Sequence, residues 1–206
     1  RNAPGDEELL GMLKSEKTRI LAFLGRDDNP EEKAILPADR SAGPLPLSYA
    51  QERLWFIDRL QGSVQYHLPT VLRLKNKIDP GALERALRAL LERHEVLRTR
   101  IAEQDGNPFQ QVLPASGWKL DYITQGAIPQ GEIAARIAEL IEQPFDLSSD
   151  FMLRAHLIER SAEDFTLVLV LHHIATDGWS NSILVRDLTA LYRAETDGKP
   201  AKLPKL

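Results

Sequence analysis

The stretch that most constrains this chain is LVLVLHHIATDGWSNSILV, which runs from Leu167 to Val185. Apolar residues lead directly into two adjacent histidines, and a polar turn that contains Asp177 and Gly178 follows. Burial of imidazoles at the end of an apolar run costs free energy unless they have hydrogen-bond partners. A pair in this position therefore has such partners or serves a function. The fold must therefore place this pair at a structural, a metal-binding or a catalytic position.

Strand and helix patterns alternate along the rest of the chain. FMLRAHLIER and DFTLVLVLHH predict two strands separated by a polar turn. Asp105-Gly106 predicts a hairpin between two further strands. Strands are expected over residues 66–75, 99–102, 109–113 and 119–123, and helices over residues 6–24, 130–143 and 179–195. This order favours an α/β fold of the α+β type, a mixed β-sheet with helices packed on it.

Two more helices carry clear start signals. Asp79 is a capping residue and Pro80 fits the first helical position, so DPGALERALRALLERHEVLRT predicts a helix. Its expected buried stripe consists of Leu83, Leu87, Leu90 and Leu91. Ser48 is expected to cap a second helix from near Tyr49. Its expected apolar face consists of Leu54, Ile57 and Phe56.

The composition is that of an ordinary globular protein, with 43% hydrophobic and 27% charged residues among 206. A net charge of −4 with well-mixed signs argues against a nucleic-acid surface. No apolar run approaches the ~20 residues that span a membrane, and no signal peptide is visible. The absence of cysteine excludes disulfides and Cys-based zinc sites, and a reducing, cytoplasmic setting is expected.

Changes in composition divide the chain into four parts. Residues 1–25 are expected to form an N-terminal linker or docking helix, and packing on the main body or on a neighbouring domain is favoured over a dedicated docking role. Residues 26–46 contain four prolines and predict a linker. Residues 47–196 form the expected main domain, and residues 197–206 an exit linker or truncation point. Because the chain begins with Arg1, we expect it to be excised from something longer.

Strand geometry separates the two histidines. Successive side chains in a strand point to opposite faces, so His172 and His173 cannot both face the same space. A zinc site that uses both is disfavoured, because a third ligand at suitable spacing is also missing. A histidine that faces a solvent channel can take or steer a proton near neutral pH.

Asp177 has two interpretations that are compatible with each other. Aspartate is a preferred helix-capping residue, and Gly178 tolerates a turn. Alternatively, an arginine partner keeps the carboxylate charged and fixes the shape of the loop. Neither interpretation makes Asp177 a catalytic acid.

Three motifs make the chain resemble the condensation domain of nonribosomal peptide synthetases. HHIATDG at His172–Gly178 fits the family motif HHxxxDG, and it is followed by WS. SYAQERLW at Ser48–Trp55 fits SxAQxRLW, and RHEVLRT at Arg93–Thr99 fits RHExLRT. The segment QYHLP at Gln65–Pro69 also resembles the family. The motifs occur in the family's order over residues 44–193.

The resemblance implies a chloramphenicol-acetyltransferase-like fold with two lobes in a V and a tunnel between them. Donor and acceptor peptidyl carrier proteins bring thioesters into the tunnel on 4′-phosphopantetheine arms, and no cofactor binds directly. The acceptor amine attacks the donor thioester and forms an amide in secondary-metabolite or antibiotic synthesis. An adjacent adenylation domain is expected, with no nucleic-acid or membrane partner. The later family motifs are absent, so the chain resembles an N-terminal lobe that is inactive without a C-terminal lobe.

The resemblance also implies roles for individual residues. His173 matches the catalytic histidine, which takes the amine proton or holds the amine by a hydrogen bond, and His172 is its structural neighbour. Gly178 leaves room for the pantetheine arm, and its N–H polarises the thioester carbonyl. Ser180 is a weaker candidate for the same surroundings.

For Asp177 the resemblance implies an ion pair with an arginine of the RHEVLRT segment. Arg98 is the first choice and Arg93 the alternative. No metal ligand is implied.

Two other functions compete with condensation. An epimerization-type domain shares HHxxxDG, but SYAQERLW and the tryptophan after the glycine favour condensation. A catalytically silent module that binds a carrier protein or another enzyme is the second alternative. Within condensation, DGWS resembles most the subtype that joins an L-configured donor to an L-configured acceptor.

Overall fold

The computed structural model describes residues 16–17, 40, 43–124 and 126–205. The chain divides into two compact units, Arg1–Ala42 and Gly43–Leu206. The helix expected over residues 6–24 lies outside the described residues apart from 16 and 17, and most of the linker expected over residues 26–46 also lies outside them. The fold and the site described below belong to the second unit.

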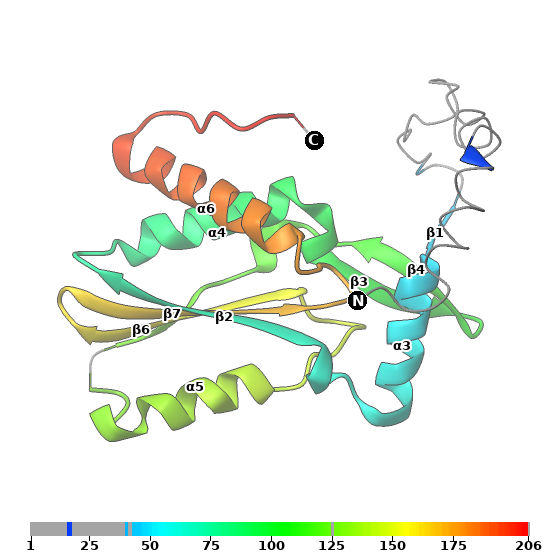
Figure 1. Ribbon diagram of the computed structural model, residues 1–206, viewed down its shortest axis with the longest axis horizontal. Helices are drawn as coiled ribbons and strands as arrows, with labels where there is room; N and C mark the ends of the chain where they lie inside the picture. Colours follow the sequence, from blue (N-terminus) through cyan, green and yellow to red (C-terminus); the bar gives the residue numbers. More distant parts are fainter. Residues whose placement is uncertain (1–15, 18–39, 41–42, 125, 206) are drawn as a thin grey trace. The chain divides into compact units, whose positions relative to one another are not determined.

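The secondary structure of this unit follows the predicted order (Figure 1). Its strands are β1 (Leu45–Pro46), β2 (His67–Lys75), β3 (Thr99–Gln104), β4 (Asn107–Val112), β5 (Asp121–Ile123), β6 (Leu153–Ser161) and β7 (Asp164–His172). Its α-helices are α3 (Tyr49–Gln61), α4 (Pro80–Arg93), α5 (Ile133–Glu142) and α6 (Ser180–Asp197). Short 3-10 helices occur at Val64–Tyr66, Glu95–Arg98, Ala115–Gly117 and Gln130–Glu132.

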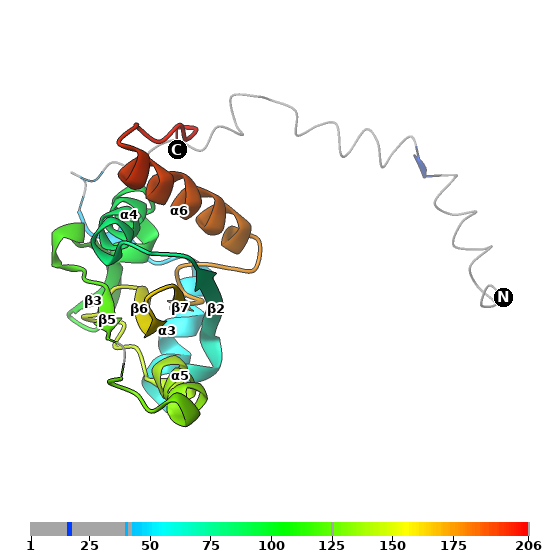
Figure 2. The same ribbon diagram turned by 90° about the vertical axis from the view of Figure 1, so that its left-hand side faces the viewer.

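A four-stranded sheet in the order β2-β7-β6-β5 forms the centre. The pairs β2/β7 and β6/β7 are antiparallel, whereas β5/β6 is parallel, so the sheet is mixed as predicted. A smaller antiparallel sheet has the order β1-β4-β3. Helices α4 and α6 cover one face of the central sheet and α5 covers the other, which Figure 2 shows from the side.

The alternation of strand β7 divides the core between these two faces. Leu167, Leu169 and Leu171 pack with the leucines of α4 in one buried cluster. Val168 and Val170 point the other way and join a second cluster with residues of α5 and its following loop. Because both faces are covered, β7 is apolar along nearly its whole length.

Local signals explain several element boundaries. The Asp79 carboxylate accepts the N–H groups of Gly81 and Ala82, and Pro80 opens α4, as predicted. Ser48 caps α3 and forms a reciprocal capping box with Gln51. The predicted hairpin joins β3 and β4.

The turn of this hairpin has a backbone reason for its residues. Asp105 and Gly106 both have positive φ, 52° and 78°. A two-residue turn of this kind requires such angles, which aspartate tolerates and glycine adopts without strain.

The structure differs from the predictions in the following places. Phe56 was expected on the inner face of α3 but is 58% exposed, and no residue of that helix is fully buried. Helix α4 ends at Arg93, because the RHEVLRT segment turns into a 3-10 helix. The strand expected over 119–123 begins only at Asp121.

Candidate active site

The paired histidines lie where strand β7 ends. The N–H of His173 donates to the carbonyl of Tyr66 at 2.9 Å, which ties the loop to the start of β2. The His173 side chain is exposed, and its Nδ1 lies 2.5 Å from the carbonyl oxygen of Thr176. A carbonyl only accepts hydrogen bonds, so Nδ1 carries a proton and Nε2 of the neutral ring has the available lone pair. The contact with Thr176 therefore holds His173 in the tautomer that a proton acceptor needs.

His172 lies in the core and is completely buried. The N–H of Ile174 donates to His172 Nδ1 at 3.1 Å, so the proton of the neutral ring is on Nε2. Nε2 donates to Ser63 Oγ at 2.9 Å, and the Ser63 hydroxyl donates to the Asp58 carboxylate of α3. This chain of bonds links α3 to the main chain directly after His173.

The surroundings of His172 keep its ring neutral. Burial is the main cause, and the neighbouring His67, His173 and Arg154 add to it, so the pKa of His172 is lowered to about 4. The ring of Phe145 packs at a steep angle against both His67 and His172, with ring centroids 5.0 and 5.6 Å away. A neutral imidazole in this position is a structural element of the core.

Asp177 precedes helix α6 and binds the first residue of that helix. Its Oδ1 accepts the N–H of Ser180 at 2.8 Å and the Ser180 hydroxyl at 2.6 Å. These two hydrogen bonds, the one from the hydroxyl first, lower the pKa of the exposed Asp177 carboxyl. The carboxylate thus fixes the turn between the histidines and α6, although Trp179 and not Asp177 occupies the N-cap position of the helix.

The predicted ion pair between Asp177 and an arginine of RHEVLRT is wrong. The Arg98 guanidinium donates to the carbonyls of Leu91 and Leu113, at 2.9 and 2.6 Å, and pairs with Glu95 at 3.2 Å. These contacts place it at the corner after α4, where its donors are already used.

Arg93, the alternative partner, is committed to a different carboxylate. Its Nε lies 2.9 Å from Asp187 of α6, and the guanidinium also donates to the Pro204 carbonyl. The two arginines therefore stabilise other contacts, and Asp177 keeps its charge through Ser180.

Asp187 is a buried carboxylate that the sequence patterns did not reveal. Its side chain is 0% exposed and accepts hydrogen bonds from Arg93 and His94, at 2.9 and 3.0 Å, and from Arg186 at 2.8 Å. Burial alone would raise the pKa of Asp187, but the hydrogen bonds from Arg186, Arg93 and His94 outweigh it and hold the pKa below its usual value. This cluster joins α6 to the RHEVLRT segment.

The exposed face of His173 borders a hollow of about 600 Å³. Residues of all three motif segments line it. SYAQERLW contributes side chains at the start of α3, RHEVLRT contributes Val96, and HHIATDG contributes the loop after β7. Its polar lining consists of Ser48, Gln51, Arg53, Tyr66, Thr176, Asp177 and Ser180. Hydroxyl, amide and guanidinium groups around one proton acceptor suit a polar reaction such as acyl transfer.

A smaller cavity of about 150 Å³ lies beside Gly178 and shares Thr176 and Asp177 with the hollow. A Cβ atom added at Gly178 would meet no other atom within 4 Å. The fold itself therefore gives no steric reason for glycine here. The space beside Gly178 is open on the side of the smaller cavity.

Ser63 and Asp58 complete the set of site residues that sequence reasoning missed. Both lie near the end of α3, and Ser63 is 2% exposed. Ser63 and His172 are 109 residues apart in the sequence, so no local pattern could have revealed their hydrogen bond.

No metal-binding group of three His, Cys, Asp or Glu residues occurs among the residues that the structure describes. Among the same residues, no helix combines the length and the apolar character that crossing a membrane requires.

Comparisons with known proteins agree with the motifs. A family model described as the condensation domain matches residues 41–206. A linear gramicidin synthase polypeptide of Brevibacillus parabrevis is 40% identical over 168 residues, which cover 79% of this chain and 3% of that protein. Phosphinothricin tripeptide synthetase PhsB of Streptomyces viridochromogenes is 42% identical over 175 residues, which cover 82% and 15%.

A solved structure, the complex of the X-domain and OxyB from teicoplanin biosynthesis, is also similar. It has a TM-score of 0.73 and 32% identity, and the match covers 84% of this chain and 36% of that one. The chain thus spans only a small part of the curated relatives that it matches, and about a third of this solved neighbour.

Proposed function

The chain belongs to the condensation-domain family of nonribosomal peptide synthetases and has that family's chloramphenicol-acetyltransferase-like fold, and from this premise we propose that it forms the lobe that carries the reactive histidine of an amide-forming enzyme. The observation that supports this most is the geometry of His173. Its Nδ1 is bound to the Thr176 carbonyl, its side chain is exposed, and it borders a polar hollow of about 600 Å³.

In the proposed step, the amine of a carrier-bound aminoacyl group attacks the carbonyl carbon of a carrier-bound donor thioester. A C–N bond forms and the C–S bond breaks, so the acyl group moves to the acceptor. The proton lost by the amine passes to Nε2 of His173 and then to the departing thiolate. The step needs no oxidant, reductant or further reactant.

His173 has two physically distinct ways to act. As a general base it removes the amine proton, which requires contact at about 3 Å. As a positioning group it holds the amine by a hydrogen bond and aligns it with the thioester. Both require Nε2 to accept a hydrogen bond, and the bond from Nδ1 to Thr176 supports either role.

The start of helix α6 is the proposed place of the thioester. Gly178 lines the 150 Å³ cavity, where a larger side chain would occupy the space that a pantetheine arm needs. Its N–H is the proposed donor for a developing oxyanion at the start of α6. Asp177 and Ser180 hold this turn in shape through their mutual hydrogen bonds.

The partners and the second half of the site are part of the proposal. Two carrier proteins deliver the thioesters from opposite sides, and an adenylation domain of the same synthetase loads the acceptor. A second lobe faces His173 and closes the tunnel. The large open hollow at His173 favours such a facing surface, because catalytic sites of this kind work best when water is excluded.

A non-catalytic binding module is the second candidate. One observation favours it, since the X-domain in the similar solved structure is in complex with another protein, OxyB. The fixed tautomer of His173 favours catalysis, because a surface used only for binding does not need an available imidazole nitrogen at a hollow.

The two candidates are separated by one experiment on the intact protein that contains this chain. An acyl-loaded donor carrier and an aminoacyl-loaded acceptor carrier are mixed with it, and the acceptor carrier is weighed by intact-protein mass spectrometry. Condensation predicts an acceptor that gains the mass of the acyl group. A binding module predicts that carriers associate but that the acceptor mass stays unchanged, and this result would remove the catalytic proposal.

A further inference from the structure

The side chain of Tyr66 lies beside His173 at the edge of the hollow. Strands β2 and β7 pair with His67 opposite His172. One residue beyond this pair, the N–H of His173 donates to the Tyr66 carbonyl at 2.9 Å. Opposite residues of an antiparallel pair point to the same face, and successive residues alternate. The paired histidines therefore enter the core, whereas Tyr66 and His173 both line the hollow of about 600 Å³.

We propose that Tyr66 is a further catalytic residue of this site, whose hydroxyl donates a hydrogen bond to the carbonyl oxygen of the aminoacyl acceptor. The proposal rests on the proposed function, since it concerns how the same site holds its acceptor. With the amine on His173 and the carbonyl on Tyr66, the acceptor is bound at two points. The hydroxyl keeps its proton, so the bonds that form and break are those of the condensation step.

The Tyr66 hydroxyl has no hydrogen-bond partner within the part of the chain that the structure describes. It is not enclosed either, because the buried side-chain oxygens that lack a hydrogen bond in that part of the chain do not include it. Two other tyrosines differ in this respect. The hydroxyl of Tyr122 donates to Glu159 at 2.6 Å. The hydroxyl of Tyr192 accepts the N–H of Asp79 at 3.3 Å. Tyr66 thus offers a free and accessible hydroxyl at the hollow.

Neighbouring polar groups of the hollow are already bonded to the protein. The Ser180 hydroxyl donates to Asp177 at 2.6 Å. The amide nitrogen of Gln51 donates to Gln110 at 3.2 Å. An acceptor can bind the Tyr66 hydroxyl without breaking any of these hydrogen bonds, so the contact costs the fold nothing.

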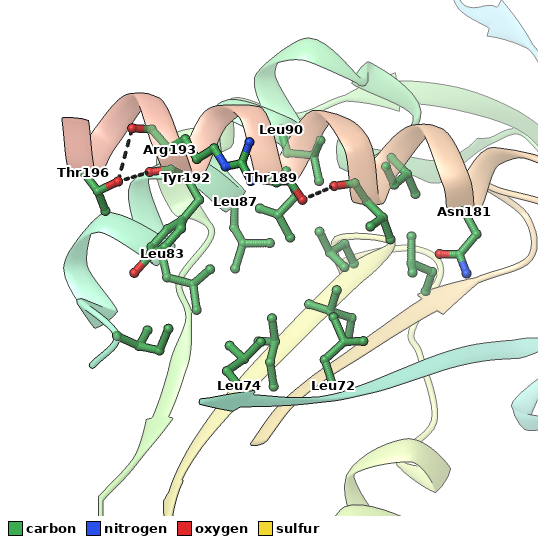
Figure 3. Close-up of a pocket in the computed structure, with 18 residues that line it drawn as sticks. Leu72, Leu74, Leu83, Leu87, Leu90, Asn181, Thr189, Tyr192, Arg193 and Thr196 are labelled. Atoms are coloured by element: carbon green, nitrogen blue, oxygen red, sulfur yellow. Dashed lines mark hydrogen bonds between the residues drawn. The ribbon is translucent and has the colours of Figure 1, made fainter. Parts of the chain in front are cut away.

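The apolar cavity of about 320 Å³ between helix α6 and the central sheet is a poor alternative place for the acceptor (Figure 3). The Thr189 hydroxyl at its wall donates to the Val185 carbonyl at 2.7 Å. The Thr196 hydroxyl donates to the Tyr192 carbonyl at 3.2 Å. Both are used within α6, and burial of an amine and a carbonyl among leucines without hydrogen bonds would cost free energy. The polar hollow at Tyr66 is therefore the favoured place.

The spacing of the two rings suits an α-aminoacyl group. The ring centroids of Tyr66 and His173 are 6.5 Å apart, and the ring planes are inclined by 34°. This separation is near the outer limit of contact between aromatic rings, so neither ring covers the face of the other. In an α-aminoacyl group the amine and the carbonyl are attached to one carbon atom. A single acceptor can therefore contact both side chains through hydrogen bonds of about 3 Å.

Two contacts align the amine better than one. An amine that is held only at Nε2 of His173 can rotate about that hydrogen bond. A second contact at the carbonyl stops the rotation and can direct the lone pair of the amine at the donor thioester. A simple amine without a carbonyl group lacks the second contact, so Tyr66 favours α-aminoacyl acceptors over other amines.

The first experiment removes only the hydroxyl. In the intact protein that contains this chain, single-turnover amide formation from loaded donor and acceptor carriers is measured for the wild type, Tyr66→Phe and Tyr122→Phe. Tyr66→Phe is expected to slow the reaction about tenfold, as the loss of one hydrogen bond to the substrate does, and to keep the urea midpoint, because the fold loses no bond.

Tyr122→Phe is the control, because it makes the same chemical change on β5, at the opposite edge of the central sheet from β2. It should react at the wild-type rate. A Tyr66→Phe rate within twofold of the wild type would overturn the proposal.

The second experiment tests which part of the acceptor the hydroxyl contacts. Free L-alanine amide and isopropylamine replace the loaded acceptor carrier; both carry the amine on a branched carbon, and L-alanine amide alone has the carbonyl. Tyr66→Phe is expected to slow acylation of alanine amide about tenfold and to leave that of isopropylamine unchanged. Acylation of alanine amide but not of isopropylamine by the wild type would also support the carbonyl contact. Equal slowing with both amines would refute the assignment.

Failure of this proposal can be distinguished from failure of the proposed function. If the wild type forms no amide with loaded carriers, the condensation function and the role of Tyr66 are both rejected. If the wild type forms the amide and Tyr66→Phe does so at the same rate, the role of Tyr66 alone is rejected.

Discussion

Replacement of Asp187 by asparagine should destabilise the fold strongly while it keeps the shape of the side chain. The carboxylate is completely buried and joins helix α6 to the end of α4. Arg93 Nε, His94 Nε2 and the Arg186 guanidinium lie within 3.0 Å of its oxygens. In Asp187→Asn the guanidinium of Arg93 remains in a poorly solvated place without a counter-charge.

The magnitude follows from the cost of leaving a buried charge unpaired. Removal of one partner from a buried ion pair typically costs about 3–5 kcal/mol. Arg186 is largely exposed and can return to water, so the lower half of that range is expected. For a unit of this size each kcal/mol shifts Tm by about 2–4 °C, which gives a fall of roughly 10 °C.

Urea unfolding at pH 7, followed by far-UV circular dichroism, measures the free energy of unfolding. The control is Glu139→Gln, which breaks the exposed ion pair with Arg136 on α5 and should change stability very little. If Asp187→Asn lost no more stability than Glu139→Gln, the carboxylate would not be the buried link described above.

Three further predictions concern the histidine loop. Ser63→Ala leaves the N–H of His172 buried without an acceptor, so the free energy of unfolding should fall by about 1–3 kcal/mol in urea. Unfolding by urea between pH 7 and pH 4 should show stability falling by up to roughly 3 kcal/mol with acidification. Stability falls with acidification because the folded-state pKa of His172, about 4, lies below the unfolded value of 6.5. The unfolded chain therefore binds more protons between these pH values. If His172→Gln lost as much stability over the same pH range, His172 would not be the cause. Gly178→Val should leave Tm unchanged, since a Cβ there meets no atom within 4 Å, but should slow amide formation about tenfold or more by filling the space of the pantetheine arm. A Gly178→Val protein that joins substrates at the wild-type rate would remove that role.

Much of the fold could be predicted because its signals are local. The Asp79–Pro80 start of α4 satisfies free N–H groups within one turn, and Asp105-Gly106 matches the φ angles of a tight hairpin. The alternation of strand β7 separates its side chains between two layers whatever the other elements do. These features predict the mixed sheet with helices on it, which the structure confirms.

The contacts across the site could not be predicted in the same way. Asp187 looks like an ordinary polar position of an amphipathic helix, and its burial depends on α4 packing against α6. Arg93 pairs with Asp187 and not with Asp177, and Asp177 instead accepts hydrogen bonds from Ser180, three residues away. Phe56 illustrates the limit of helical periodicity, because the pattern identifies an apolar position but not the element that covers it.

The rate of amide formation shows whether the proton-accepting nitrogen of His173 takes part in the reaction. Single-turnover rates are measured by rapid quench at saturating carrier concentrations in the intact protein, for the wild type and for His173→Ala. Carrier binding is measured in parallel, so a loss of rate is not mistaken for a loss of association. Loss of a general base or of the group that holds the amine predicts a rate lower by about 10²–10⁴-fold with carrier affinity unchanged. A His173→Ala protein that forms the amide within twofold of the wild-type rate would show that His173 neither accepts the proton nor holds the amine.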